Sequence, residues 1–130
     1  MDTTNSSAES LVGNWRSVAV IDPPASGYFR VTADFKFFAA EPMPPNSKRK
    51  VHYAHFRMLA ENITSSTFTL RFAGKEGGSE RRYFFEGDIL VLAADVMDGE
   101  RRWSCCHVAQ EDLPEYFEPE FLIASTKPWN

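Results

Sequence analysis

The sequence lacks any long hydrophobic run, and this absence limits its relation to membranes. No segment of the 130-residue chain approaches the ~20 apolar residues that a membrane-spanning helix needs. Residues 1–9 are polar and lack the cationic-then-apolar order of a signal peptide. We therefore expect no membrane span and no secretion signal.

Cysteine and histidine are scarce as well. The two cysteines, Cys105 and Cys106, are adjacent; neighbours on a strand point to opposite faces, so a disulfide between them would be strained. Free thiols indicate a reducing compartment, and we expect a cytoplasmic location. The histidines are His52, His55 and His107. Positions three apart on a strand face opposite ways, so His52 and His55 do not share one metal ion. We expect no metal ion and no cofactor.

A strong excess of one charge is also missing. The chain has 14 basic and 18 acidic residues, for a net charge of −4. Broad nucleic-acid binding depends on many Lys and Arg side chains, so we expect no nucleic-acid partner. The one compact basic run, Lys48-Arg49-Lys50, lies in a proline-rich stretch and is typical of a solvated loop tip. The sequence has no Gly-rich phosphate loop, Ser-centred elbow or Cys-x-x-Cys pair.

Aromatic residues are plentiful by contrast. The chain contains 11 phenylalanines, and aromatic residues make up 14% of it. Aromatic side chains favour strands and bring large buried areas, so the composition points to a β protein. The length fits one domain. We expect a disordered N-terminal tail over residues 1–10 and a single domain over residues 11–130.

Short apolar runs alternate with turn signals along the whole domain, and no long helical pattern interrupts them. The expected strands are residues 14–21, 28–38, 51–59, 67–72, 81–85, 89–94, 101–108 and 121–125. Residues 28–38 alternate most clearly, with Phe29, Val31, Ala33, Phe35 and Phe37 on one face. About eight strands with short connections predict an all-β, antiparallel up-and-down barrel. Such a barrel is either filled by side chains or able to hold one small ligand.

Two short segments resemble a known family. Leu11-Val12-Gly13-Asn14-Trp15-Arg16 carries a Gly-x-Trp element at the start of the first strand. This resembles the opening of lipocalins and other calycin-type barrels, in which the Trp plugs the closed end. Residues 83–92 are similar to a strand–turn–strand hairpin of small bacterial lipocalin-like domains. In the family a basic residue often packs over the Trp; here Lys127 is the only basic residue of the last stretch. The family's secretion signal and disulfides are absent, which favours an intracellular lipocalin-like domain.

The strand at residues 51–59 allows two orientations. Tyr53, His55 and Arg57 share one face, and Phe56 and Met58 share the other. If Phe56 and Met58 face the core, the polar trio is a solvated face. If the barrel is hollow, the trio points inward and fixes the polar head of a ligand, since an Arg fork binds a carboxylate or phosphate bidentately.

Strand-borne arginines raise the same question of orientation. Arg71 stands alone on its strand, whereas Arg81-Arg82 and Arg101-Arg102 are neighbouring pairs. One member of each pair is expected inside the barrel or at its mouth. A buried Arg without a partner is costly, so an inward Arg must meet an acidic side chain or await an anionic ligand.

Two further features admit a functional and a structural interpretation. Cys105 and His107 share a strand face with Trp103. The pair is either a nucleophile with its base or a pair of buried structural residues. The acidic segment 110–120 has three interpretations. It is a loop whose Leu113, Tyr116 and Phe117 cap a barrel mouth, or it is a lid over a ligand, or it is a contact surface for a basic partner.

The leading hypothesis is a module that binds a small hydrophobic or acidic ligand inside the barrel. The expected ligand-binding residues are Tyr53, His55, Arg57, Arg71, Trp103, Tyr116 and Phe117. The alternative is a protein-interaction or structural domain with a packed core, for example a homodimer. An isomerase or hydrolase with His55 or His107 as base ranks third, and we expect no catalytic residues.

Overall fold

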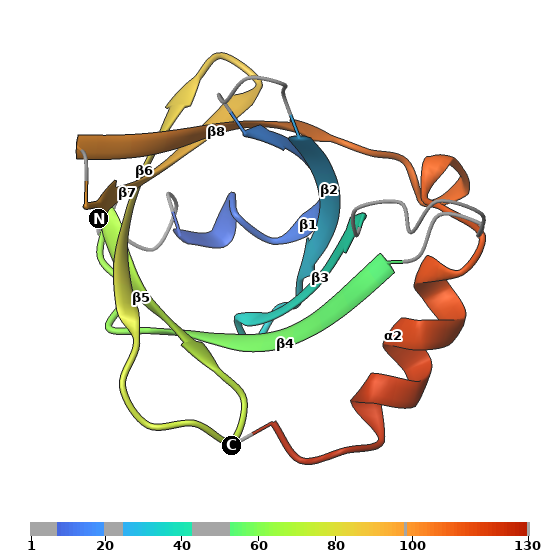
Figure 1. Ribbon diagram of the computed structural model, residues 1–130. Helices are drawn as coiled ribbons and strands as arrows, with labels where there is room; N and C mark the ends of the chain where they lie inside the picture. Colours follow the sequence, from blue (N-terminus) through green and yellow to red (C-terminus); the bar gives the residue numbers. More distant parts are fainter. Residues whose placement is uncertain (1–7, 20–24, 43–52, 98, 130) are drawn as a thin grey trace.

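The computed structural model describes residues 8–19, 25–42, 53–97 and 99–129. Within these ranges, eight antiparallel strands follow one another around a closed barrel (Figure 1). Each strand pairs with the next in sequence, and β1 also pairs with β8. The strands are β1 (Gly13–Ala19), β2 (Ala25–Val31), β3 (Lys36–Pro42), β4 (Tyr53–Glu61), β5 (Thr67–Phe72), β6 (Ser79–Glu86), β7 (Ile89–Val96) and β8 (Gly99–His107). The expected all-β up-and-down barrel is confirmed.

The strand expected over residues 28–38 is wrong, because a tight turn divides it into β2 and β3. The Thr32 backbone N–H donates to the Lys36 carbonyl at 2.9 Å, and the Lys36 N–H donates to the Thr32 hydroxyl at 3.0 Å. Phe35 takes a φ of 59°, which is uncommon for a residue with a bulky side chain. Thr and Asp favour such local bonds, so Thr32 and Asp34 were the turn signal within the alternating run.

The strand expected over residues 121–125 is also wrong. Those residues end the helix α2 (Phe117–Ser125), which the short helix η1 (Gln110–Asp112) precedes. Pro119 fits there because the first turn of a helix has N–H groups without an internal partner. Phe117, Phe121 and Ala124 recur at helical spacing on the face that packs against the barrel. Over the four apolar residues 121–124, a helical periodicity cannot be distinguished from a short strand.

A turn at the N-terminus closes one end of the barrel. The Leu11 N–H donates to the Ala8 carbonyl at 3.0 Å, and both side chains are buried. In Figure 1 this turn lies inside the ring of strands. Trp15 packs beside it, fully buried, and its indole N–H donates to the Leu11 carbonyl at 2.8 Å. The described fold thus begins at Ala8, three residues before the expected domain boundary; residues 1–7 lie outside the described part.

A second apolar cluster lies outside the barrel, between its wall and α2 (Figure 1). Phe38 and Ala40 point outward from β3 and are covered by Phe117 and Ala124 of α2 and by Trp129. The Phe38 ring meets the Phe117 ring edge-on at a centroid distance of 5.3 Å. The acidic segment therefore lies against the outer wall, and its expected place over a barrel mouth is wrong. Its apolar side chains follow the outward-facing aromatic surface of β3.

Arg30 of β2 binds the segment that contains η1 and α2 to the barrel wall. Its guanidinium donates to both carboxylate oxygens of Glu118, at 2.6 and 3.1 Å, and to the Gln110 side chain at 2.8 Å. The guanidinium also lies 4.4 Å from the centre of the Phe121 ring. The hydrogen bond from Arg30 holds the pKa of Glu118 below its ordinary value of 4.5. A carboxylate whose pKa is lower in the folded state than in the unfolded state stabilises the fold at pH values above its unfolded-state pKa.

This contact predicts acid sensitivity. The stabilisation from Glu118 is complete above pH 4.5 and is lost as the pH falls through the folded pKa. We expect Glu118→Gln to lower the Tm at pH 7 and to match the wild type more closely at pH 3. Because the Glu118 side chain is 41% exposed, the difference at pH 7 will be small. Thermal melts at both pH values, with exposed Glu115→Gln as the control, check this; an equal Tm difference at both values would contradict it.

Candidate functional site

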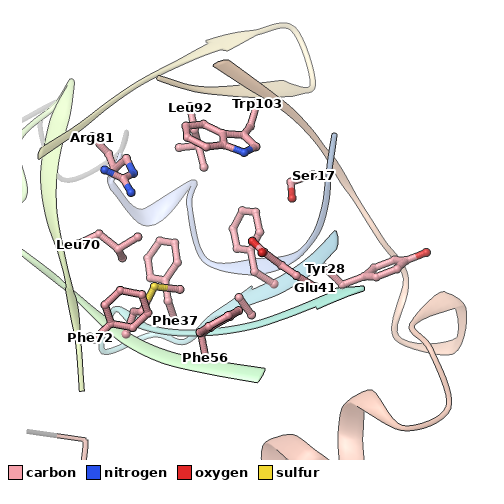
Figure 2. Close-up of a pocket in the computed structure, with 13 residues that line it drawn as sticks. Ser17, Tyr28, Phe37, Glu41, Phe56, Leu70, Phe72, Arg81, Leu92 and Trp103 are labelled. Carbon is pink, nitrogen blue, oxygen red and sulfur yellow. The ribbon is translucent and has the colours of Figure 1, made fainter. Parts of the chain in front are cut away.

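A cavity of about 220 Å³ lies inside the barrel, at the end opposite the N-terminal turn (Figure 2). Each of the eight strands contributes at least one residue to its lining. Most of the lining is aromatic or aliphatic. The lining residues are Ser17, Tyr28, Phe29, Phe37, Ala39, Glu41, Phe56, Met58, Leu70, Phe72, Arg81, Leu92 and Trp103.

The hollow end follows from the distribution of large side chains along the strands. At the closed end, Trp15, Phe68 and Tyr83 are buried and fill the interior. Toward the other end, two small residues, Ser17 and Ala39, stand among the larger side chains that line the cavity. Phe72, at the end of β5, is 51% exposed although it lines the cavity. The cavity is therefore open to solvent on this side.

Arg81 is the cation of this cavity. Its side chain points into the apolar interior from β6 (Figure 2). One terminal nitrogen donates to the Ser79 hydroxyl at 2.6 Å, and the guanidinium lies 5.8 Å from the centre of the Trp103 ring. No carboxylate of the described residues forms an ion pair with it. Burial accordingly lowers the pKa of Arg81.

The neighbouring Arg82 points outward from the same strand and forms ion pairs. Arg82 pairs with Asp95 at 3.1 Å and with Glu100 at 2.5 Å. Glu100 also accepts a hydrogen bond from Arg102 at 2.6 Å. These carboxylates raise the pKa of Arg82, whereas burial lowers that of Arg81. Of the two chemically identical side chains, the inward one is left without an acidic partner among the described residues.

The structure resolves the two orientations of the third expected strand. Phe56 and Met58 of β4 point into the cavity, and His55 and Arg57 point outward. The outer cluster covers part of the outward face, so His55 and Arg57 are half-buried there. His55 stacks on Phe38 at 5.6 Å, and Arg57 donates to the Pro128 carbonyl at 2.6 Å. Tyr53 begins β4, and its side chain lies outside the described part of the structure.

The other expected binding residues divide between the two clusters. Trp103 lines the cavity. Tyr116 and Phe117 lie outside the barrel, where Tyr116 meets His55 edge-on at 5.7 Å. Arg71 donates to both carboxylate oxygens of Glu61, at 2.9 and 3.0 Å. Of the six expected residues whose side chains the structure describes, Trp103 lines the cavity, whereas His55, Arg57, Tyr116 and Phe117 lie outside the barrel near α2 and the segment that follows it.

Three polar residues that line the cavity were not among the expected binding residues. These are Ser17, Glu41 and Arg81. A signal existed for Arg81, since one of two adjacent strand arginines must face inward. Ser17 also follows from strand periodicity, because it lies two positions after the buried Trp15 in β1. Glu41 lies between the strands expected over residues 28–38 and 51–59, and in the structure it is part of β3.

The pairing of Cys105 with His107 does not produce a reactive thiol. Cys105 is fully buried at the closed end, and burial raises the pKa of its thiol to about 12. It therefore stays protonated at neutral pH, where the thiol is a poor nucleophile. His107 stacks on Trp15 at a centroid distance of 3.8 Å. The side chain over Trp15 is thus His107, from the last strand. The arrangement favours the structural interpretation of Cys105.

No three His, Cys, Asp or Glu side chains of the described residues form a group that could hold a metal ion. His52 lies outside these residues. Within them, no helix combines the length and the apolar character needed to cross a membrane.

The fold and its cavity define an eight-stranded, closed antiparallel barrel with a mostly apolar interior space, consistent with a calycin-like barrel. No family model, curated protein or solved structure matches the chain. The chemistry of the cavity is therefore the basis for the function proposed below.

Proposed function

We propose that the chain is a lipocalin-like binding module that holds a small amphipathic anion inside its barrel. The observation that carries this proposal is Arg81, a cation inside an apolar cavity and without a carboxylate partner among the described residues. The apolar part of the ligand would lie against Phe37, Phe56 and Leu70. Its anionic group would meet the guanidinium of Arg81.

The energetics of burial support a ligand for Arg81. A charged side chain that leaves water without an opposite charge destabilises the fold. Arg81 donates to the Ser79 hydroxyl and to the Glu80 carbonyl and contacts the Trp103 ring, but none of these partners carries a negative charge, and burial lowers the pKa of Arg81. A bound carboxylate or phosphate would supply the missing charge through two parallel hydrogen bonds.

The size of the cavity limits the ligand. Its volume of about 220 Å³ is below the ~300–1,000 Å³ typical of pockets for drug-sized molecules. A single aromatic ring or a short alkyl chain with one acidic group fits this description. Of the residues expected to bind a ligand, we carry Trp103 into the proposal, since its ring borders both the cavity and Arg81.

The proposal predicts that Arg81→Met weakens the binding of 3-phenylpropanoate. We expect the affinity to fall by about tenfold or more, the usual value of a charge-assisted hydrogen bond. Isothermal titration calorimetry measures the effect. Arg82→Met is the matched control, since it removes the same charge from the adjacent, outward position. The control should bind the acid with wild-type affinity.

A second readout separates binding from folding. Because Arg81 is desolvated without an acidic partner, Arg81→Met should have an unfolding free energy equal to or above that of the wild type. Equal affinity of wild type and Arg81→Met for the acid would overturn the role of Arg81. A wild type that does not bind the acid would count against the proposed ligand class.

Compartment and domain organisation complete the proposal. Both thiols are free, with Cys105 buried and Cys106 exposed, which fits a reducing compartment such as the cytoplasm. We propose that residues 11–130 act as one binding domain. Native mass spectrometry of the purified protein, compared with a denatured sample, would show a co-purified ligand as a mass excess that denaturation removes.

A second candidate function is association with another protein chain. Leu122 and Ile123 are adjacent on the outer side of α2 and are 57% and 54% exposed. Exposed apolar neighbours of this kind favour a contact surface, for example in a homodimer. The same native spectra test it, because a dimer peak would support association and a monomer alone would count against it.

A further inference from the structure

Two opposite charges face the same apolar cavity without meeting each other. Glu41 lines the cavity from β3, and Arg81 lines it from β6; β4 and β5 separate these strands around the barrel. Figure 2 shows the two side chains reaching toward the cavity from different sides. The structure shows no ion pair between them, and no cation of the described residues pairs with Glu41.

The side chain of Glu41 is held against the barrel wall. Gly27 of β2 lies beside it, and a Cβ at that position would be 3.2 Å from Glu41 Cγ and 3.1 Å from the Ala40 carbonyl oxygen. Both contacts are tighter than ordinary van der Waals distances, so the absence of a side chain at Gly27 leaves the space that Glu41 occupies. Glu41 is exposed overall, so solvent also reaches this residue of the cavity lining.

This arrangement discriminates among ligands by charge. A ligand with only an anionic group gains the interaction with Arg81 but carries its charge into a space that Glu41 also faces. A ligand with only a cationic group gains the interaction with Glu41 but carries its charge into a space that Arg81 also faces. A ligand with both groups, separated by an apolar body, interacts favourably with both side chains, and like-charge contacts disfavour its competitors.

We propose that the ligand is amphoteric, with an anionic group at Arg81, an apolar body between the aromatic walls, and an ammonium or similar cationic donor at Glu41. This inference rests on the proposed function and adds the second polar group. Ser17, from β1, offers a hydroxyl to the same cavity.

The test compares two probes with the same ring. One is 3-phenylpropanoate, and the other is 3-[4-(aminomethyl)phenyl]propanoate, which adds a para ammonium group. We expect wild-type protein to bind the amphoteric probe about fivefold more tightly, the upper range for a solvent-exposed ion pair. In Glu41→Gln, which keeps the size of the side chain, the two probes should bind equally.

The matched control is Glu86→Gln. Glu86 is an exposed carboxylate at the end of β6 away from Arg81, so its removal changes the net charge equally and should leave the fivefold preference intact. Circular dichroism of each variant confirms that the barrel is folded.

The outcomes separate this inference from the proposed function. If the plain acid binds in an Arg81-dependent way but the amphoteric probe is no tighter, or its preference survives Glu41→Gln, the inference is overturned and the proposed function stands. If wild-type protein binds neither probe, both are overturned. A preference that Glu41→Gln removes and Glu86→Gln retains supports the inference.

Discussion

Trp15→Ala should lower the free energy of unfolding by about 3–5 kcal/mol, the usual cost of removing a fully buried aromatic side chain. Trp15 is completely buried. Its ring centroid lies 3.8 Å from that of His107 and 6.4 Å from that of Phe29. The substitution removes these contacts and leaves a cavity at the closed end. Urea denaturation followed by circular dichroism measures the loss.

The hydrogen bond of the indole adds to this effect. Without the N–H of Trp15, the Leu11 carbonyl loses a donor at 2.8 Å in a buried environment. Leu11 belongs to the turn that closes the barrel, so we expect that turn to exchange its amide hydrogens faster in the variant. Trp15→Phe keeps an aromatic ring without the N–H and should lose less stability than Trp15→Ala.

Trp103→Ala provides the comparison for Trp15. Trp103 is half-buried and borders the open cavity, so its removal enlarges an existing space and should cost less than removal of Trp15. A smaller loss for Trp15→Ala than for Trp103→Ala would contradict the packing described for the closed end.

Phe38→Ala should have the second largest effect, about 3–5 kcal/mol. Phe38 is 1% exposed although it points away from the barrel interior. Its ring centroid lies 5.3 Å from that of Phe117 and 5.5 Å from that of Phe121. The variant should keep the barrel and release α2, which depends on this outer cluster.

Hydrogen exchange distinguishes release of α2 from general unfolding. Protection of the backbone N–H of Glu120, which donates to the Tyr116 carbonyl at 3.2 Å, should fall more than protection within β7 and β8. Ile123→Ala is the control on the same helix; Ile123 is 54% exposed, so the change should be within about 0.5 kcal/mol. Uniform loss of protection across the barrel in Phe38→Ala would contradict a separate outer cluster.

The barrel itself could be predicted from local sequence patterns. Residues 67–72 alternate as Phe68, Leu70 and Phe72 against polar neighbours, and the strand β5 has those bounds. The turn at Gly87-Asp88 joins β6 and β7, with Glu86 opposite Ile89. Such signals are local, because strand period and turn chemistry depend on residues close in the chain.

The count of eight strands was correct although two of its parts were wrong. One expected strand is two, divided at Thr32–Phe35, and another is the C-terminal half of α2. The first error arose because the alternation continues across the turn that Thr32 and Asp34 form. The second arose because Phe117 and Phe121 are apolar through their packing on Phe38, and an apolar run shows that it is buried without showing what covers it.

The candidate site shows the same division. Strand alternation by itself determined that one of Arg81 and Arg82 faces inward, and that Phe56 and Met58 oppose His55 and Arg57. It did not determine which face is inside, because both faces of β4 are covered, one by the barrel interior and one by the outer cluster. That choice depends on contacts between residues far apart in sequence, such as Arg57 with Pro128. The sequence thus determined a closed β-barrel with an inward arginine, and only the tertiary structure decided that this arginine is Arg81 and that its cavity is shared with Glu41, because both depend on how distant strands come together.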